Sequence, residues 1–213
     1  STPLYSSAAS DVYKRQLHIL PHWTWPGREG EVTPVFVYTN YPTAELFING
    51  KSYGKQSKNN SSLKSRYRLM WMDAVYEPGE VKVVAYNKDG KAVAEKTVRT
   101  AGKPHHIELV SNRNELTADG KDLAYVTVKV VDKDGNLCPT DSRLIHFSVK
   151  GAGKFRAVAN GDPTNLEQFH LPKMHAFHGM LTAIVQAGEI AGDLVLTAKA
   201  SGVKTGTVHL QAK

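Results

Sequence analysis

The sequence is poor in features that would fix a compartment or a cofactor. It has one cysteine, Cys138, which excludes an internal disulfide framework, and exported bacterial proteins also often lack disulfides. The sequence shows neither a nearby base nor a cause for a lowered pKa at Cys138, so we expect a small buried or half-buried side chain. No apolar run is long enough to cross a membrane, so no membrane span is predicted. No glycine-rich phosphate loop follows a strand, and we therefore predict no cofactor.

A basic run is also missing, although the formal net charge is +7. The lysines and arginines stand beside acidic residues, as in Lys88-Asp89, Glu95-Lys96 and Asp132-Lys133-Asp134. Proteins that bind nucleic acids concentrate positive charge on one face or carry a recognisable motif. We therefore expect a solvated surface and no nucleic-acid partner.

The first sixteen residues do not read as an ordinary protein segment. Reverse translation of Ser6 to Gln16 can give the codon string of the adapter that transposases deliver in short-read library preparation. We therefore expect residues 1–16 to be a disordered, non-native translation of that adapter, and exclude them from fold reasoning. On this interpretation the native gene is cut at Leu17 and the chain is a fragment.

Strand patterns fill the first half of the remaining chain, while helical periodicity is never sustained for three turns. Asn49-Gly50 is a strong hairpin signal, because both central positions of such a turn need positive φ. The alternation of apolar and polar residues predicts strands at 32–38, 44–48, 67–72, 81–86 and 92–98.

A second set of strands follows the short linker Ala101-Gly102-Lys103-Pro104. Its spacing is typical of a Greek-key sandwich. The predicted strands are 107–110, 124–131, 144–149, 181–185, 194–198 and 203–210. The predicted fold class is all-β, with two tandem immunoglobulin-like β-sandwich domains at 17–102 and 103–213.

The connection from Ala159 to Met180 is long and contains three histidines, His170, His175 and His178. A loop of this length in a compact domain is usually functional or mobile. The histidine spacing matches no standard zinc pattern, so we predict no metal site and interpret these residues as an exposed loop. Their proximity in sequence to Asp162 leaves one alternative, a loop contact to an ion or a substrate.

The aromatic residues near Leu17 allow two interpretations. His22, Trp23 and Trp25 are amphipathic rings that suit an interface with one wet edge. Alternatively, Trp23 and Trp25 join Tyr38 and Tyr41 in a platform that stacks on a sugar ring, as in carbohydrate-binding modules. We favour packing in a core or an interface, and a row of exposed, coplanar rings would reverse that preference.

Several motifs together resemble the C-terminal β-sandwich domains of bacterial glycoside hydrolase family 2 enzymes, especially β-galactosidase-like members from Bacteroidetes. The segment Leu17 to Trp25 resembles the exit from the catalytic barrel of that family. The remaining motifs are Ala44 to Ser52, Tyr76-Glu77-Pro78-Gly79, Val98 to Pro104 and Asn160-Gly161-Asp162-Pro163-Thr164.

The resemblance implies a parent enzyme that hydrolyses β-linked sugars with two glutamates on its barrel, about 5 to 5.5 Å apart. Neither glutamate motif is present here, so we expect no catalytic residue and no activity from this chain alone. The implied partner is the missing N-terminal catalytic barrel, with His22, Trp23 and Trp25 at the seam. Carbohydrate contact, a homo-oligomeric parent and a periplasmic or extracellular location are further implications.

A protein from another class remains as the alternative. The segments Thr117 to Lys121 and Val126 to Val130 also resemble bacterial surface immunoglobulin-like repeats. This likeness predicts a carbohydrate-binding or cell-surface adhesion module. Adhesin repeats lack the Leu17 to Trp25 segment, which favours the hydrolase.

Overall fold

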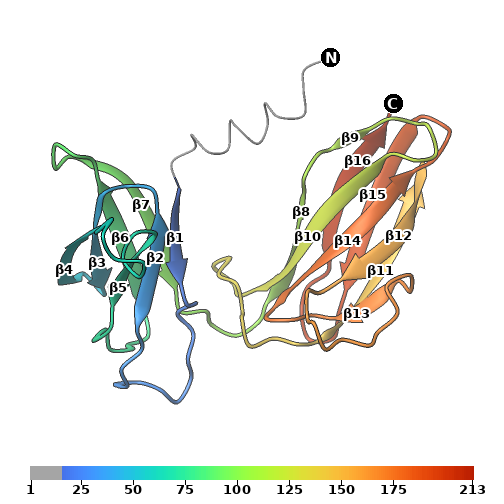
Figure 1. Cartoon of the computed structure of the whole chain (residues 1–213). Coiled ribbons are helices and arrows are strands. Elements are labelled where there is room, and N and C mark those ends of the chain that lie inside the picture. Colours follow the sequence, from blue (N-terminus) through green and yellow to red (C-terminus); the bar gives the residue numbers. More distant parts are fainter. Residues whose placement is uncertain (1–15) are drawn as a thin grey trace. The chain divides into compact units, whose positions relative to one another are not determined.

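The computed structural model describes residues 16–213, and in this part of the chain it contains strands and no helix. The all-β prediction is therefore confirmed. The chain divides into two compact units between Thr100 and Ala101, two residues before the boundary that the sequence suggests (Figure 1). Except for Gln16, the segment interpreted as an adapter translation lies outside the described residues. Residues 16–213 include no helix that could span a membrane.

Over residues 16–100, unit 1 is a sandwich of a three-stranded and a four-stranded sheet. The first sheet joins β1 (Leu17–Leu20), β2 (Val35–Thr39) and β5 (Arg68–Trp71) in that order. The second sheet has the order β4-β3-β6-β7, and all its pairs are antiparallel. Its strands are β3 (Thr43–Ile48), β4 (Lys51–Ser57), β6 (Glu80–Tyr86) and β7 (Ala92–Arg99). Because the chain changes sheets after β2, after β4 and again after β5, the topology is that of an immunoglobulin-like sandwich.

The core of unit 1 follows from the two-residue period of its strands. Along β2, Val35 and Val37 are fully buried, while the alternate residues Phe36 and Tyr38 face outward. The same alternation buries every second residue of β3, β5 and β6. The side chains of both sheets meet in one apolar cluster between the layers.

The predicted hairpin at Asn49-Gly50 joins β3 to β4, with φ angles of 48° and 82°. Asn49 also holds the loop before β6, because its Oδ1 accepts a 2.8 Å hydrogen bond from the Glu80 N–H. Gly79 has a φ of +139°, and a Cβ there would lie 2.0 Å from Asn49 Oδ1. A side chain at position 79 would therefore displace the Asn49 contact.

Unit 2 packs a four-stranded sheet on a five-stranded sheet. The first, in the order β12-β14-β10-β8, contains β8 (His106–Ser111), β10 (Leu123–Val131), β12 (Gly153–Ala159) and β14 (Met180–Ala187). The second has the order β13-β11-β15-β16-β9. Its strands are β9 (Glu115–Leu116), β11 (Leu144–Gly151), β13 (Lys173–His175), β15 (Gly192–Lys199) and β16 (Gly206–Ala212).

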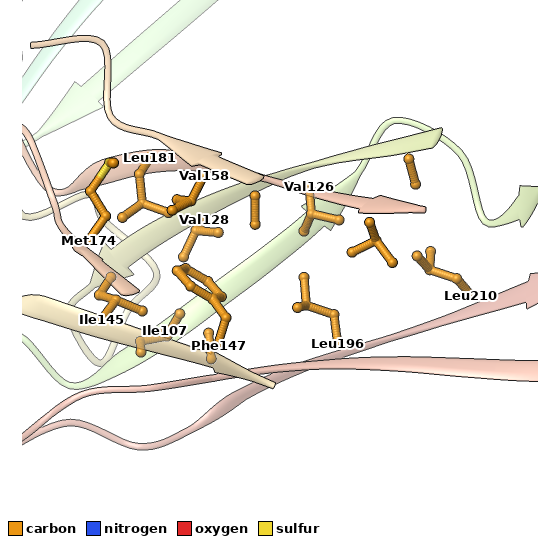
Figure 2. Packing of buried hydrophobic residues seen from close by; sticks show 14 of the residues in the cluster. Ile107, Val126, Val128, Ile145, Phe147, Val158, Met174, Leu181, Leu196 and Leu210 are labelled. Atoms are coloured by element: carbon orange, nitrogen blue, oxygen red, sulfur yellow. The ribbon is translucent and has the colours of Figure 1, made fainter. Parts of the chain in front are cut away.

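Figure 2 shows the core of unit 2, where side chains from both sheets fill the space between them. Val126 and Val128 of β10 come from one sheet, and Phe147 of β11 and Leu196 of β15 come from the other. The Phe147 ring stacks on Phe155 of β12, with centroids 5.8 Å apart. Phe155 thus connects β12 to the core, although the sequence pattern predicts no strand there.

Candidate functional site

Trp23 lies in the core of unit 1. Its side chain is 1% exposed, and its Nε1 donates a 2.9 Å hydrogen bond to the carbonyl of Glu77. Its ring meets Tyr76 edge-on, with centroids 5.2 Å apart. An interface or sugar-stacking role needs accessible indole surface, so the structure corrects the expectation for this residue: Trp23 stabilises the sandwich from within.

His22 and Trp25 form a stacked pair beside this core. Their ring centroids are 4.0 Å apart, and Trp25 Nε1 donates a 2.9 Å hydrogen bond to the His22 carbonyl. Nδ1 of His22 accepts the Thr24 N–H at 3.3 Å, which assigns the proton of a neutral imidazole to Nε2. The guanidinium of Arg28 lies 5.4 Å from the centroid of the Trp25 ring. Both rings are half-buried and remain candidates for an interface.

The four rings suggested as a sugar platform do not share one surface. Tyr41 is 7% exposed and belongs to the same core cluster as Trp23. Tyr38 is 38% exposed and points outward from β2. Two of the four rings are therefore unavailable to a ligand, which counts against the platform.

The connection between β12 and β14 is organised by Asn160. Its Nδ2 donates to the His175 carbonyl at 2.9 Å, and its Oδ1 accepts the Asp162 N–H at 3.1 Å and Asn165 Nδ2 at 3.3 Å. Asp162 Oδ1 in turn accepts hydrogen bonds from the N–H and hydroxyl of Thr164. The Thr164 hydrogen bonds, with a smaller contribution from nearby His178, lower the pKa of Asp162. The Asp162 carboxylate thus acts as a cap within the loop.

The three histidines of this connection do not converge, and two of them contact different partners. His175 Nδ1 lies 3.1 Å from Glu167 Oε1, and His178 Nδ1 donates to the Pro139 carbonyl at 3.2 Å. His170 is exposed. Within the described part of the chain, no group of three or more His, Cys, Asp or Glu side chains could hold a metal ion. The hydrogen bonds of His175 and His178 are those of side chains that fasten a loop.

Cys138 is a buried free thiol. Burial, together with the negative charges of Asp132 and Asp141, raises the pKa of Cys138 to about 11. A catalytic or redox-active cysteine needs a lowered pKa, because the thiolate is the reactive form. This environment therefore suits a structural thiol.

One concave feature was not anticipated from the sequence. A pocket of about 480 Å³ opens in unit 2 between the β11–β12 turn and the β14–β15 turn. Glycines form much of its wall, Lys154 and Glu189 are its charged residues, and its lining includes no aromatic ring. The Gly151-Ala152-Gly153 turn is the sequence signal that could have located it.

Two family models match the chain. Residues 107–209 match Glycoside hydrolase family 2 C-terminal domain 5, and residues 30–94 match a domain of unknown function (DUF4982). A β-galactosidase of Bacteroides ovatus is 41% identical over 211 residues, which are 99% of this chain and 24% of the relative. The chain belongs to the C-terminal region of the glycoside hydrolase family 2 proteins.

Other similar proteins are also glycosidases by name. A crystal structure of a β-glycosidase from Bacteroides vulgatus superimposes with a TM-score of 0.85 at 31% identity, over 93% of this chain and 25% of that one. A putative β-glucuronidase of Formosa agariphila is 33% identical over 151 residues, 70% of this chain and 14% of the relative. The chain thus spans about a quarter or less of the length of the family 2 proteins that it matches.

Proposed function

We propose that this chain is the non-catalytic ancillary region of a family 2 glycoside hydrolase that cleaves β-linked sugars, and that it supports a catalytic barrel elsewhere in the parent protein. The observation that carries the proposal is the match to a β-galactosidase along 99% of this chain but only 24% of that enzyme. The remaining three quarters of such an enzyme has room for the barrel and its two glutamates.

The electrostatics of the carboxyl groups support a non-catalytic role. The pKa is lowered at Glu45, Asp119, Asp122, Asp132 and Asp162. For Glu45, the hydrogen bond from the Ser52 hydroxyl is the main cause, and it outweighs burial. The general acid of a glycosidase needs a raised pKa to remain protonated near neutral pH. These five carboxyl groups are therefore unsuited to that role.

The proposal is tested by a chimera in which residues 17–213 replace the matching C-terminal region of the B. ovatus β-galactosidase. We expect the chimera to hydrolyse a nitrophenyl β-galactoside and the isolated chain to show no turnover above buffer. The barrel without either C-terminal region is the matched control and should be less stable than the chimera. Turnover by the isolated chain, or a folded but inactive chimera, would contradict the proposal.

A further inference from the structure

The outer face of the β1-β2-β5 sheet carries a row of apolar side chains, although the opposite face of the same sheet already covers the core. The strand registers align the outward residues in two rows across the sheet. One row contains Leu20, Phe36 and Met70, and the other contains His18, Tyr38 and Arg68. Leu20 is 42% exposed, and Met72, just after β5, is 57% exposed. We call these seven residues the β1-β2-β5 outer face.

The other sheet of unit 1 shows what a solvated outer face looks like in this domain. Lys82 lies over the Phe47 ring at 5.5 Å from its centroid, and Lys55 lies over the Tyr86 ring at 4.1 Å. Glu45 accepts a 2.9 Å hydrogen bond from the Tyr86 hydroxyl. Lysine stems and charges thus cover the aromatic rings of this sheet, as expected for a surface in water. The β1-β2-β5 outer face has no lysine.

Arg68 is the one arginine on the β1-β2-β5 outer face, and it links the aromatic rings there. Its guanidinium lies 5.3 Å from the Phe36 centroid, and its Nη1 donates a 3.2 Å hydrogen bond to the Tyr38 hydroxyl. Among residues 16–213, no carboxylate forms an ion pair with Arg68. Tyrosine, phenylalanine, methionine and arginine are the residues enriched at protein interfaces, and Tyr and Arg dominate their binding energy. The composition therefore favours a protein partner that presents apolar side chains and an acceptor for Arg68.

We propose that the β1-β2-β5 outer face docks on the part of the parent hydrolase that precedes this C-terminal region in the family 2 architecture. The proposal rests on the proposed function. The matching model is a C-terminal domain, and the B. ovatus relative has about three quarters of its length outside the matched region. The outer face includes His18 and Leu20 of β1, the first strand of unit 1 among the residues from 16 onward. A domain connected to β1 by the polypeptide stays within reach of this sheet. The connection therefore raises the effective concentration of that domain at the β1-β2-β5 outer face.

The methionines provide a direct test. The isolated chain and the chimera described above are treated with dilute hydrogen peroxide, and sulfoxide formation is followed by peptide mass spectrometry. We expect Met72 and Met70 to be oxidised at least about tenfold more slowly in the chimera, since docking removes them from solvent. Met174, fully buried in unit 2, is the internal control and should be protected in both proteins. Equal oxidation of Met72 in the two proteins would overturn the proposal.

A matched pair of lysine substitutions tests the same face by stability. Leu20 is 42% exposed on the β1-β2-β5 outer face, and Val93 is 41% exposed on β7. Leu20→Lys should lower the Tm of the chimera by about 5 °C and leave that of the isolated chain unchanged. Val93→Lys should affect neither protein. Equal effects of the two substitutions in the chimera would contradict docking through this face.

The outcomes separate the two proposals. An active chimera in which Met72 is oxidised freely would refute docking through this face and leave the proposed function intact. A folded but inactive chimera would refute the proposed function, while the oxidation pattern would still report on docking. A second copy of the chain is the competing occupant. If the isolated chain sediments as a dimer and Met72 is protected from oxidation in that dimer, self-association accounts for this face and our proposal is overturned.

Discussion

The Thr100 hydroxyl donates a 2.6 Å hydrogen bond to the backbone carbonyl of Trp23, 77 residues earlier in the chain. The same oxygen accepts the N–H of Gly79 at 3.0 Å. One hydroxyl therefore joins the segment after β1, the loop before β6 and the end of unit 1. Trp23 is thus held on both sides, by this bond to its carbonyl and by the bond from its indole to Glu77.

Replacement of Thr100 by valine should destabilise unit 1 by about 1 to 3 kcal/mol, because the shape is kept while a carbonyl and an N–H lose their partner. All three tryptophans of the chain lie in unit 1, so tryptophan fluorescence during urea unfolding reports on this unit alone. Thr97→Val on β7 is the matched control and should change stability by less than about 0.5 kcal/mol. Equal losses for the two variants would show that the bridge contributes nothing.

A comparison of Gly179 with Gly202 separates two reasons for glycine in unit 2, a close approach of neighbouring backbone and a positive φ. Both residues have a φ of +74°. A Cβ at Gly179 would lie 2.3 Å from the Cys138 carbonyl oxygen, whereas a Cβ at Gly202 would meet only Arg143 Nη1 at 3.8 Å. A side chain would therefore meet the same backbone strain at both positions, and only at Gly179 would it also clash with the backbone of Cys138.

We expect Gly202→Ala to cost about 1 to 2 kcal/mol from its left-handed backbone alone. Gly179→Ala should cost about 1 to 3 kcal/mol more, because the Cys138 backbone must move. Urea unfolding followed by circular dichroism measures both values. Labelling of the buried Cys138 thiol should also accelerate in Gly179→Ala and much less in Gly202→Ala. Similar losses in the two variants would mean that the loop relaxes without cost.

The sequence is informative for most strands that bury one face and expose the other. The sequence predicts β6 and β10 because valine or alanine occupies every second position along each strand. β12 was missed because a bulge between Phe155 and Ala157 breaks its alternation, and β9 and β13 because they contain only two and three residues. Local pattern carries no signal for such short pairings, which depend on distant strands.

The interface candidates were harder to read from the sequence. Aromatic residues suit both a core and an interface, so residue type alone could not place Trp23 between the sheets. β2 does carry a signal for an interface, because its sequence Val-Phe-Val-Tyr places apolar or aromatic side chains on both faces of the strand. Such a strand is typical of a sheet that is covered on both faces. This pattern indicates the β1-β2-β5 outer face more directly than the histidine and tryptophans after β1 do.

Asn160 should control the order of the loop that follows β12. Asn160→Ala removes the hydrogen bonds to the His175 carbonyl, the Asp162 N–H and Asn165, and so releases the connection from three anchors. We expect limited proteolysis within residues 160–172 to become about tenfold faster, with a smaller change in global stability. Gln168→Ala, in an exposed part of the same loop, is the control and should leave the cleavage rate unchanged. Equal rates for wild type and Asn160→Ala would contradict this role.

Asp132 is a buried carboxylate at the turn after β10. It is 2% exposed, and it accepts hydrogen bonds from the N–H groups of Gly102, Asp134 and Asn136 and from the Asn136 side chain. Burial raises the pKa of Asp132, but these hydrogen bonds together outweigh burial and lower it below its ordinary value. The ionised carboxylate therefore fastens Gly102, near the start of unit 2, to the turn after β10.

The lowered pKa makes unit 2 sensitive to acid. Because the pKa of Asp132 is lower in the folded than in the unfolded state, its stabilisation is complete above about pH 4 and is lost as the pH falls through the folded pKa. Asp132→Asn should cost about 2 kcal/mol or more at pH 7, and its disadvantage should shrink on acidification. Urea unfolding by circular dichroism from pH 7 to pH 2.5 measures this convergence. Asp134→Asn, two residues away and exposed, is the control, and its free energy of unfolding should follow that of the wild type with pH. A difference in free energy of unfolding between wild type and Asp132→Asn that stays constant with pH would refute the electrostatic account.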